Sequence, residues 1–212
     1  MPYYVRTMRL ADVGQVTEID REAFPTLWPP PNYKRELQNN VCHHIVAIDD
    51  TTSKMVEPRL AMRVASGIKR WFGWSSGPQP KQEFIIGFAG IWMMADEAHI
   101  TSLAVREKYR GQKVGELLLI ALCELVVKLK ARTMTLEVRV SNDVAQKLYT
   151  KYGFARAGLR RGYYTDKRED ALLMTTPDIT SVAFQEHFAR LKRDYFLTSK
   201  QIFRVGILRG NL

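Results

Sequence analysis

Residues 99–154 read HITSLAVREKYRGQKVGELLLIALCELVVKLKARTMTLEVRVSNDVAQKLYTKYGF, and this stretch decides the fold. The apolar residues 100–105 predict a strand that ends at the charged cluster 106–108. The run 116–127 contains good helix formers and is too long for a typical strand, so it predicts a helix. The period-two alternation over 133–140 predicts a second strand, and a second helix follows it.

The turn between the first strand and helix has the composition of an anion-binding loop. It reads Tyr109-Arg110-Gly111-Gln112-Lys113-Val114-Gly115. The first-turn N–H groups of a helix have no partners inside it, and the macrodipole places partial positive charge there, so a pyrophosphate can bind at that end. Gly111 and Gly115 permit close approach, and Arg110 adds charge. Such turns also occur without a ligand, so the loop alone leaves both interpretations open.

The second strand carries a carboxylate in an otherwise apolar pattern. Met134, Leu136, Val138 and Val140 share one face, while Thr135, Glu137 and Arg139 share the other. Glu137 is therefore either paired with a neighbour such as Arg139 or available for proton transfer. Ser141-Asn142-Asp143 then offers a helix N-cap, and Gly153 supplies the C-terminal stop. One helix face between them carries Val144, Leu148 and Tyr152, with Tyr149 beside it.

Together these segments resemble the GNAT superfamily of N-acetyltransferases. The resemblance rests on Leu103-Ala104-Val105, Tyr109-Arg110-Gly111-Gln112, Leu136-Glu137-Val138-Arg139, Ser141-Asn142 and the run from Leu148 to Phe154. It is strongest to the RimI type, which acetylates the N-terminal amine of a ribosomal protein, and to its archaeal and eukaryotic relatives. It spans Val5 to Thr176 apart from one insert. It implies an α/β (α+β) fold in which a mixed central sheet of about six or seven strands is flanked by helices.

The resemblance also implies roles for particular residues. Glu137 matches the carboxylate that deprotonates the amine, and Tyr149 matches the tyrosine that protonates the departing thiolate. The residues that match the acetyl-CoA site are Leu103, Ala104, Val105, Arg110, Gly111, Gln112, Lys113, Val114, Gly115 and Asn142. Lys113 departs from the family pattern, which has glycine there. Its side chain either crowds the pyrophosphate and strains a backbone of positive φ, or brings its ammonium to the phosphate oxygens.

Two aromatic segments are candidates for the acceptor site. The loop that contains Phe24, Leu27 and Trp28 is rich in proline and cannot be regular helix. In N-terminal acetyltransferases the matching loop frames the acceptor peptide, and the segment matching Tyr163-Tyr164 lines the peptide slot. The alternative is that the first three residues pack a loop onto the core and that the two tyrosines are ordinary surface aromatics.

The net charge of +10 belongs mainly to two segments. Residues 51–82 carry six lysine and arginine residues against one acid, and residues 179–212 carry six against two. We expect an acetyltransferase domain at 1–176 with 51–82 as a basic insert, and a helical C-terminal extension at 177–212. The insert has a basic amphipathic pattern, which fits a membrane surface, rRNA or an acidic partner, or a surface helix with its apolar face on the domain.

The rest of the chain predicts further elements and excludes some classes. We expect strands at 5–8, 44–48, 83–95 and 98–105, helices at 12–24, 33–39 and 181–196, and a closing hairpin of 154–159 and 171–175 around 160–166. Asp12 is the expected cap of the first helix. Cys42 and Cys123 make no disulfide framework and, with His43-His44, no metal set. The start has no signal-peptide run and no stretch reaches ~18 apolar residues, so we expect a cytoplasmic protein without a transmembrane segment.

The leading hypothesis is an acetyl-CoA-dependent N-acetyltransferase, without a metal, that acts on a protein N-terminus such as that of a ribosomal protein. One alternative is acetylation of lysine or of a small-molecule amine. Another is a non-catalytic ribosome- or RNA-binding module on the same fold, which Lys113 and the two basic segments favour.

Overall fold

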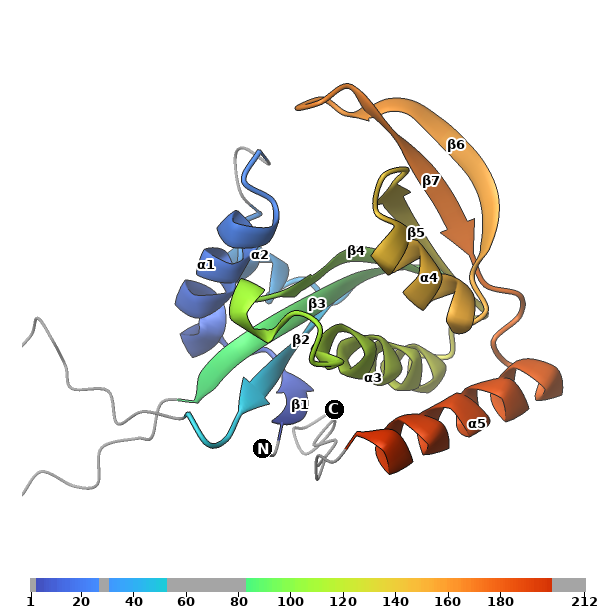
Figure 1. The fold of residues 1–212 in the computed structure, drawn as a ribbon, viewed down its shortest axis with the longest axis horizontal. Helices are drawn as coiled ribbons and strands as arrows, with labels where there is room; N and C mark the ends of the chain where they lie inside the picture. Colours follow the sequence, from blue (N-terminus) through green and yellow to red (C-terminus); the bar gives the residue numbers. More distant parts are fainter. Residues whose placement is uncertain (1–2, 27–30, 53–82, 200–212) are drawn as a thin grey trace, which may run out of the picture.

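The computed structural model describes residues 3–26, 31–52 and 83–199 (Figure 1). Within them, one sheet has the strand order β1-β2-β3-β4-β5-β7-β6. The strands are β1 (Tyr3–Thr7), β2 (Cys42–Asp49), β3 (Phe84–Met94), β4 (Glu97–Val105), β5 (Thr133–Arg139), β6 (Ala155–Tyr164) and β7 (Glu169–Thr175). The helices are α1 (Val13–Ala23), α2 (Tyr33–Glu36), α3 (Val114–Lys128), α4 (Asp143–Lys151) and α5 (Val182–Thr198), with 3-10 turns η1 (Leu10–Asp12) and η2 (Glu107–Tyr109).

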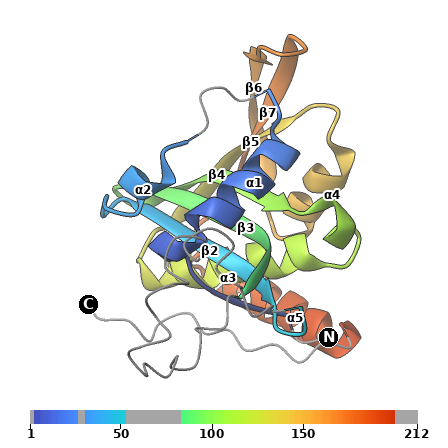
Figure 2. The ribbon, with the colours of Figure 1, turned by 90° about the vertical axis from the view of Figure 1, so that its left-hand side faces the viewer.

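Helices cover both faces of the sheet (Figure 2). On one face, Val16 and Ile19 of α1 and Tyr33 of α2 pack against Phe88 of β3. On the other face lies α3, whose side chains are buried around most of its circumference. A helix that is apolar all round must be covered on more than one side. The sheet covers α3 on one side, and Phe184, Phe188 and Tyr195 of α5 belong to the same apolar cluster.

The centre of the sheet opens between β4 and β5. These two strands are parallel, as expected for strands joined through a crossover helix, here α3. Their pairing runs only from Glu97↔Thr133 to Ile100↔Leu136. Beyond it, β4 continues to Val105 with β3 as its partner, and β5 continues to Arg139 paired with β7. The two strands therefore diverge toward their C-terminal ends, and a bulge in β4 opposite Gly90 and Ile91 lies at the point of divergence.

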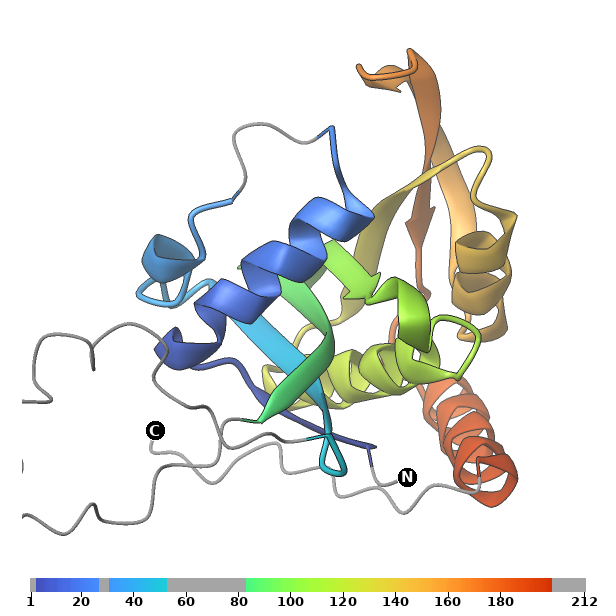
Figure 3. The same ribbon diagram turned by 60° about the vertical axis from the view of Figure 1, so that its left-hand side comes forward.

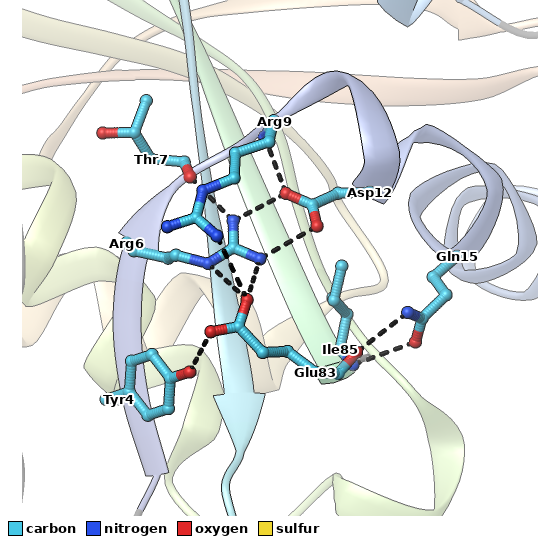
Figure 4. Close-up of polar contacts among 8 residues, drawn as sticks. All are labelled: Tyr4, Arg6, Thr7, Arg9, Asp12, Gln15, Glu83 and Ile85. Carbon is cyan, nitrogen blue, oxygen red and sulfur yellow. Dashed lines mark hydrogen bonds and ion pairs between the residues drawn. The ribbon is translucent and has the colours of Figure 1, made fainter. Parts of the chain in front are cut away.

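A buried charge cluster fastens β1 to the start of α1 (Figure 4). Arg6 donates to both carboxylate oxygens of Asp12, at 2.6 and 2.9 Å, and to Glu83. Glu83 also accepts from the Tyr4 hydroxyl at 2.5 Å. The prediction that Asp12 caps α1 with its side chain is wrong, because its carboxylate accepts from Arg6 and from the Arg9 N–H instead.

The remaining expected helices and strands of the described residues are confirmed with shifted boundaries. The closing hairpin differs most: β6 continues through 160–164, which we expected to be a loop, and the turn lies at 165–168. The second helix is shorter than expected, because α2 ends at Glu36. Cys123 is buried in α3 and both cysteines are free. None of the described helices has the length and hydropathy needed to cross a membrane. Except for Thr51 and Thr52, the basic insert lies outside the described residues.

Candidate active site

Glu137 lies in β5, where β4 and β5 begin to separate. Its carboxylate side chain is 5% exposed, and both oxygens have partners. Oε2 lies 3.0 Å from Nε2 of His99 on β4, and Oε1 lies 2.9 Å from the Arg160 guanidinium on β6. The alternative of pairing with Arg139 is wrong, because that guanidinium binds Asp166 and Glu169. Glu137 on β5 is thus held by one side chain from β4 and one from β6.

A chain of hydrogen bonds leads from Glu137 across β5 and β4. Nδ1 of His99 lies 3.1 Å from Oγ1 of Thr135, and that hydroxyl donates to Glu97 at 3.0 Å. Because the Thr135 proton points to Glu97, Nδ1 of His99 must be the donor to Thr135. The other ring nitrogen, Nε2, lies 3.0 Å from Oε2 of Glu137 and completes the chain from the carboxylate to Glu97. This arrangement can accept, hold and pass on a proton.

Two tyrosines lie near Glu137, and a third, Tyr149, lies near one of them. The Tyr164 hydroxyl donates to the Glu137 carbonyl oxygen at 3.4 Å, and Tyr163 packs edge-on against Tyr164. Tyr149 of α4 is buried, and burial, with the nearby Tyr164, raises the pKa of its hydroxyl. Burial, then Tyr163, raises the pKa of Tyr164 to about 12. Burial and the Glu137 carboxylate raise the pKa of Tyr163, which is 45% exposed. All three are therefore neutral hydrogen-bond donors at pH 7.

A second polar network ties the hairpin to the loop after α1. Arg139 donates to Asp166 at 2.9 and 3.0 Å and to Glu169 at 3.1 Å, and its guanidinium lies 4.0 Å from the centre of the Tyr164 ring. Asp166, at the hairpin turn, also accepts from Thr26 at 2.9 Å. Figure 3 shows that the end of α1 and the tip of the β6–β7 hairpin rise on the same side of the sheet. The two segments therefore meet across the face that carries Glu137.

The loop before α3 has the geometry of an anion-binding site. Gly111 and Lys113 have φ of 75° and 61°, and Lys113 is the N-cap residue of α3. The first backbone bond into the helix comes from Leu117 to the Lys113 carbonyl, so the N–H groups before it lie at the open end of the helix. A side chain at positive φ costs about 1–2 kcal/mol that glycine avoids. The backbone strain expected at Lys113 is therefore present.

Several side chains of the expected cofactor segment point elsewhere than toward a ligand. Lys113 Nζ donates to Thr198 at 3.0 Å, and Gln112 donates to the Lys108 carbonyl and accepts from Tyr3. Val114 is buried in the core. Asn142 caps α4 by accepting from the Ala145 N–H at 3.1 Å. What these residues present to a ligand is mainly backbone, beside the diverging segment Leu103–Val105.

The expected acceptor residues divide into three groups. Phe24 is partly buried and packs against the cluster under α1, which agrees with the core-packing alternative. Tyr163 and Tyr164 lie beside Glu137, as described above. Leu27 and Trp28 lie outside the described residues.

Comparison with known sequences decides the family. Residues 13–154 match the sequence model of the Acetyltransferase (GNAT) family. The chain belongs to this family. Its members are acetyltransferases, and we therefore describe this protein as an acyltransferase enzyme. The seven-stranded mixed sheet flanked by helices is the fold that the resemblance implied.

Individual relatives of this GNAT protein include bacterial and archaeal enzymes. A Bacillus subtilis protein named "putative ribosomal protein bS18-alanine N-acetyltransferase" is 36% identical over 80% of this chain and 92% of its own length. An N-alpha-acetyltransferase of Sulfurisphaera tokodaii is 32% identical over 82% of this chain and 93% of its own. Among solved structures, the ribosomal-protein-S18-alanine N-acetyltransferase of Escherichia coli has a TM-score of 0.62 at 25% identity, covering 83% of this chain and 94% of its own.

Sequence reasoning did not identify His99 or Arg160 as neighbours of Glu137. A signal for His99 was present, because Glu97 and His99 alternate with the buried residues Ala98 and Ile100. A crossover helix between β4 and β5 also predicts that these strands are parallel neighbours. Combining the two would have placed His99 on the face of Glu137. No comparable signal marked Arg160, because its partner depends on the register of β6. Within the described ranges, no group of three or more His, Cys, Asp or Glu side chains could hold a metal.

Proposed function

We propose that this GNAT enzyme transfers the acetyl group of acetyl-CoA to the N-terminal α-amine of a protein, and that a ribosomal protein is the acceptor. The assignment of the acceptor rests on the relatives, whose names specify alanine of a ribosomal protein or an α-amine. The structural observation that supports the transfer reaction is the buried Glu137 carboxylate between His99 and Arg160. We assign the catalytic domain to 1–176, with the insert 51–82, and the extension to 177–212.

Glu137 acts as the base in this proposal. An α-amino group has an ordinary pKa of ~7.7–8.0, against ~10.4 for lysine, so it loses its proton near neutral pH with little assistance. A carboxylate has about four lone-pair sites, and His99 and Arg160 use only two of them. The remaining sites can accept a proton from the incoming amine, directly or through one water. His99 and Thr135 then offer that proton a route toward Glu97.

Tyr149 supplies the second proton. As the amine nitrogen bonds to the carbonyl carbon, the carbon–sulfur bond breaks and the sulfur needs a proton. The raised pKa of Tyr149 keeps the hydroxyl protonated until that moment. N–H groups of the diverging segment Leu103–Val105 are the candidates that donate to the carbonyl oxygen while it carries charge.

The residues of the loop fit the phosphates of acetyl-CoA. A Cβ added at Gly111 would meet no atom within 4 Å, so space is open there. The N-terminal end of α3, with its unpaired N–H groups and the neighbouring Arg110, provides hydrogen-bond donors and positive charge. The parted ends of β4 and β5 leave main-chain groups of residues 103–105 beside the path toward Glu137.

The acceptor face favours a chain terminus over a compact amine. The Thr26–Asp166 bond closes one side of the face, and the tyrosines line the approach to Glu137. A peptide end can enter such a slot with its amine first, whereas a lysine must insert through its side chain alone. Residues 51–82 remain a candidate contact for rRNA or an acidic partner.

The test is CoA release from acetyl-CoA with three acceptor classes: peptides with free N-termini, N-terminally blocked peptides with one lysine, and spermidine. We expect turnover with the first class, and a fall of about 10²–10⁴-fold in kcat for Glu137→Gln and for Tyr149→Phe with acetyl-CoA affinity retained. Glu124→Gln is the matched control, since Glu124 lies on α3 and pairs with Lys192. Turnover confined to lysine or spermidine would contradict the acceptor, and turnover kept by both variants would contradict the residue roles.

A further inference from the structure

The N-cap of α3 is fastened to a helix that lies far from it in the sequence. The Tyr195 hydroxyl donates to the Lys113 carbonyl at 3.2 Å, and Lys113 Nζ donates to Thr198 Oγ1 at 3.0 Å. Further along, Lys192 is paired with Glu124 of α3. Residue numbers rise along α3 as they fall along α5, so the two helices pack antiparallel. The C-terminal end of α5 lies at the N-terminal end of α3, as Figure 1 shows.

Tyr195 is the buried residue through which α5 contacts the loop before α3. It is 2% exposed and belongs to the same apolar cluster as α3, together with Phe184 and Phe188. Its ring is therefore fixed by packing, and its hydroxyl donates to the backbone carbonyl of Lys113 on the loop. That carbonyl also accepts the first helical bond, from Leu117. Orientation of the Lys113 peptide consequently sets the direction of the open N–H groups of α3.

Lys113 needs such support more than glycine would. Its φ of 61° lies in the left-handed region, which residues with a Cβ occupy reluctantly. The family pattern stated above has glycine at this position, and this chain instead has a lysine whose ammonium is drawn away to Thr198. The ammonium thus points to α5 and not to the open end of α3.

We propose that Tyr195 is a positioning residue for cosubstrate binding: α5 holds Lys113 in the left-handed conformation, and so keeps the phosphate-binding end of α3 formed. The inference rests on the proposed function, because it takes acetyl-CoA as the ligand of that loop. It assigns the C-terminal helix a part in cosubstrate affinity and none in the transfer step.

The test is calorimetric titration of acetyl-CoA into the full-length protein without acceptor. Tyr195→Phe removes one hydroxyl and keeps the ring, so we expect Kd to rise about three- to tenfold, the range for one neutral hydrogen bond. At saturating acetyl-CoA, kcat should stay within about twofold. Lys192→Met is the matched control, since it removes an α5–α3 contact without touching Lys113. Its Kd should match that of the wild type.

A second background separates positioning from general loss of packing. In Lys113→Gly the left-handed conformation no longer needs support, so adding Tyr195→Phe should change Kd by less than about twofold. An equal loss in both backgrounds, or an equal loss for Lys192→Met, would overturn the inference. So would wild-type binding that Tyr195→Phe leaves unchanged, while the proposed function would stand. Absence of acetyl-CoA binding by the wild type would overturn both.

Discussion

The two halves of the site are built from different materials. The half assigned to the cosubstrate consists of main chain: the diverging end of β4, two residues of positive φ and the N-terminal end of α3. The half assigned to the acceptor consists of side-chain networks, in which Glu137, Arg139 and their partners come from four strands and a loop. We therefore expect substitutions within the acceptor half to have larger effects than substitutions of side chains within the loop of the cosubstrate half.

The largest effect is expected from Arg6→Met, which breaks the charge cluster between β1 and α1 and so lowers the free energy of unfolding of the whole domain. The Arg6 and Asp12 side chains are each 8% exposed, and the change leaves the Asp12 carboxylate buried without its bidentate partner. Breaking a buried pair in this way costs about 3–5 kcal/mol, which urea unfolding can measure. Arg132→Met, which removes a surface pair with Asp178, should cost less than about 1 kcal/mol. Equal losses for the two variants would contradict the prediction.

His99→Gln should affect the acceptor half alone. The substitution removes the imidazole from Oε2 of Glu137 and leaves the carboxylate less well oriented. We expect kcat to fall about 10²-fold, as for a small misplacement of a reacting group, with acetyl-CoA Kd unchanged. His187→Gln is the control, because His187 lies on α5 and contacts the Lys151 carbonyl. A parallel loss of acetyl-CoA affinity would show that the halves are coupled.

Arg139→Met should have a smaller effect, because we expect it to weaken acceptor binding and to leave the rate of the transfer step unchanged. It removes the bonds to Asp166 and Glu169 and so frees the hairpin turn from β5. Arg139 is 28% exposed at its side chain, so we expect acceptor KM to rise about tenfold, or about 1.4 kcal/mol. Steady-state kinetics with kcat and acetyl-CoA KM as internal references measure this. Arg161→Met, an exposed arginine of the same hairpin, should leave acceptor KM unchanged. A fall in kcat would contradict the assignment.

The smallest effect is a pH dependence outside both halves. Thr180, and then Arg132, lower the pKa of Asp178 to about 2 from its ordinary value of 3.8. A folded-state pKa below the unfolded one stabilises the fold above the unfolded value, and the benefit is lost as pH falls from about 4 to 2. Thermal melts should therefore show wild type above Asp178→Asn at pH 5 to 7, with the difference in Tm vanishing toward pH 2. A difference independent of pH would contradict this origin.

The main-chain half could be predicted because its determinants are contiguous. Residues 100–127 contain the strand, the loop and the helix in order, so periodicity and glycine placement were sufficient to predict these three elements. Phe184, Phe188 and Tyr195 also recur at helical spacing in the sequence, and all three are buried on α5. Helical spacing was misleading for Val144, which shares a predicted helix face with Tyr152 yet is 82% exposed in the first turn of α4.

The side-chain half could not be predicted, because its partners are far apart in the sequence. Thr26 and Asp166 are separated by 140 positions. Local pattern made Arg139 the obvious partner of Glu137, but residues two apart on a strand share a face without having to pair. The register between β5 and β7 instead brings Arg139 toward the hairpin turn. Partner choice was thus fixed by tertiary register, which periodicity does not contain.

The junction between β2 and β3 has a consequence for how this chain can be lengthened or shortened. Asp49 and Phe84 are directly paired, Asp49 binds Thr51 and Thr52, and Glu83 is held by Arg6. The chain therefore leaves the sheet at Asp49 and re-enters it at Phe84 at one fixed position, whatever sequence joins the two strands. Loop closure costs only ~0.6 kcal/mol per doubling of length, so cutting the span about eightfold would gain roughly 2 kcal/mol. Because Tyr109 also binds Asp49, a sequence grafted between β2 and β3 would begin next to the start of the loop that precedes α3, away from the β6–β7 hairpin (Figure 1).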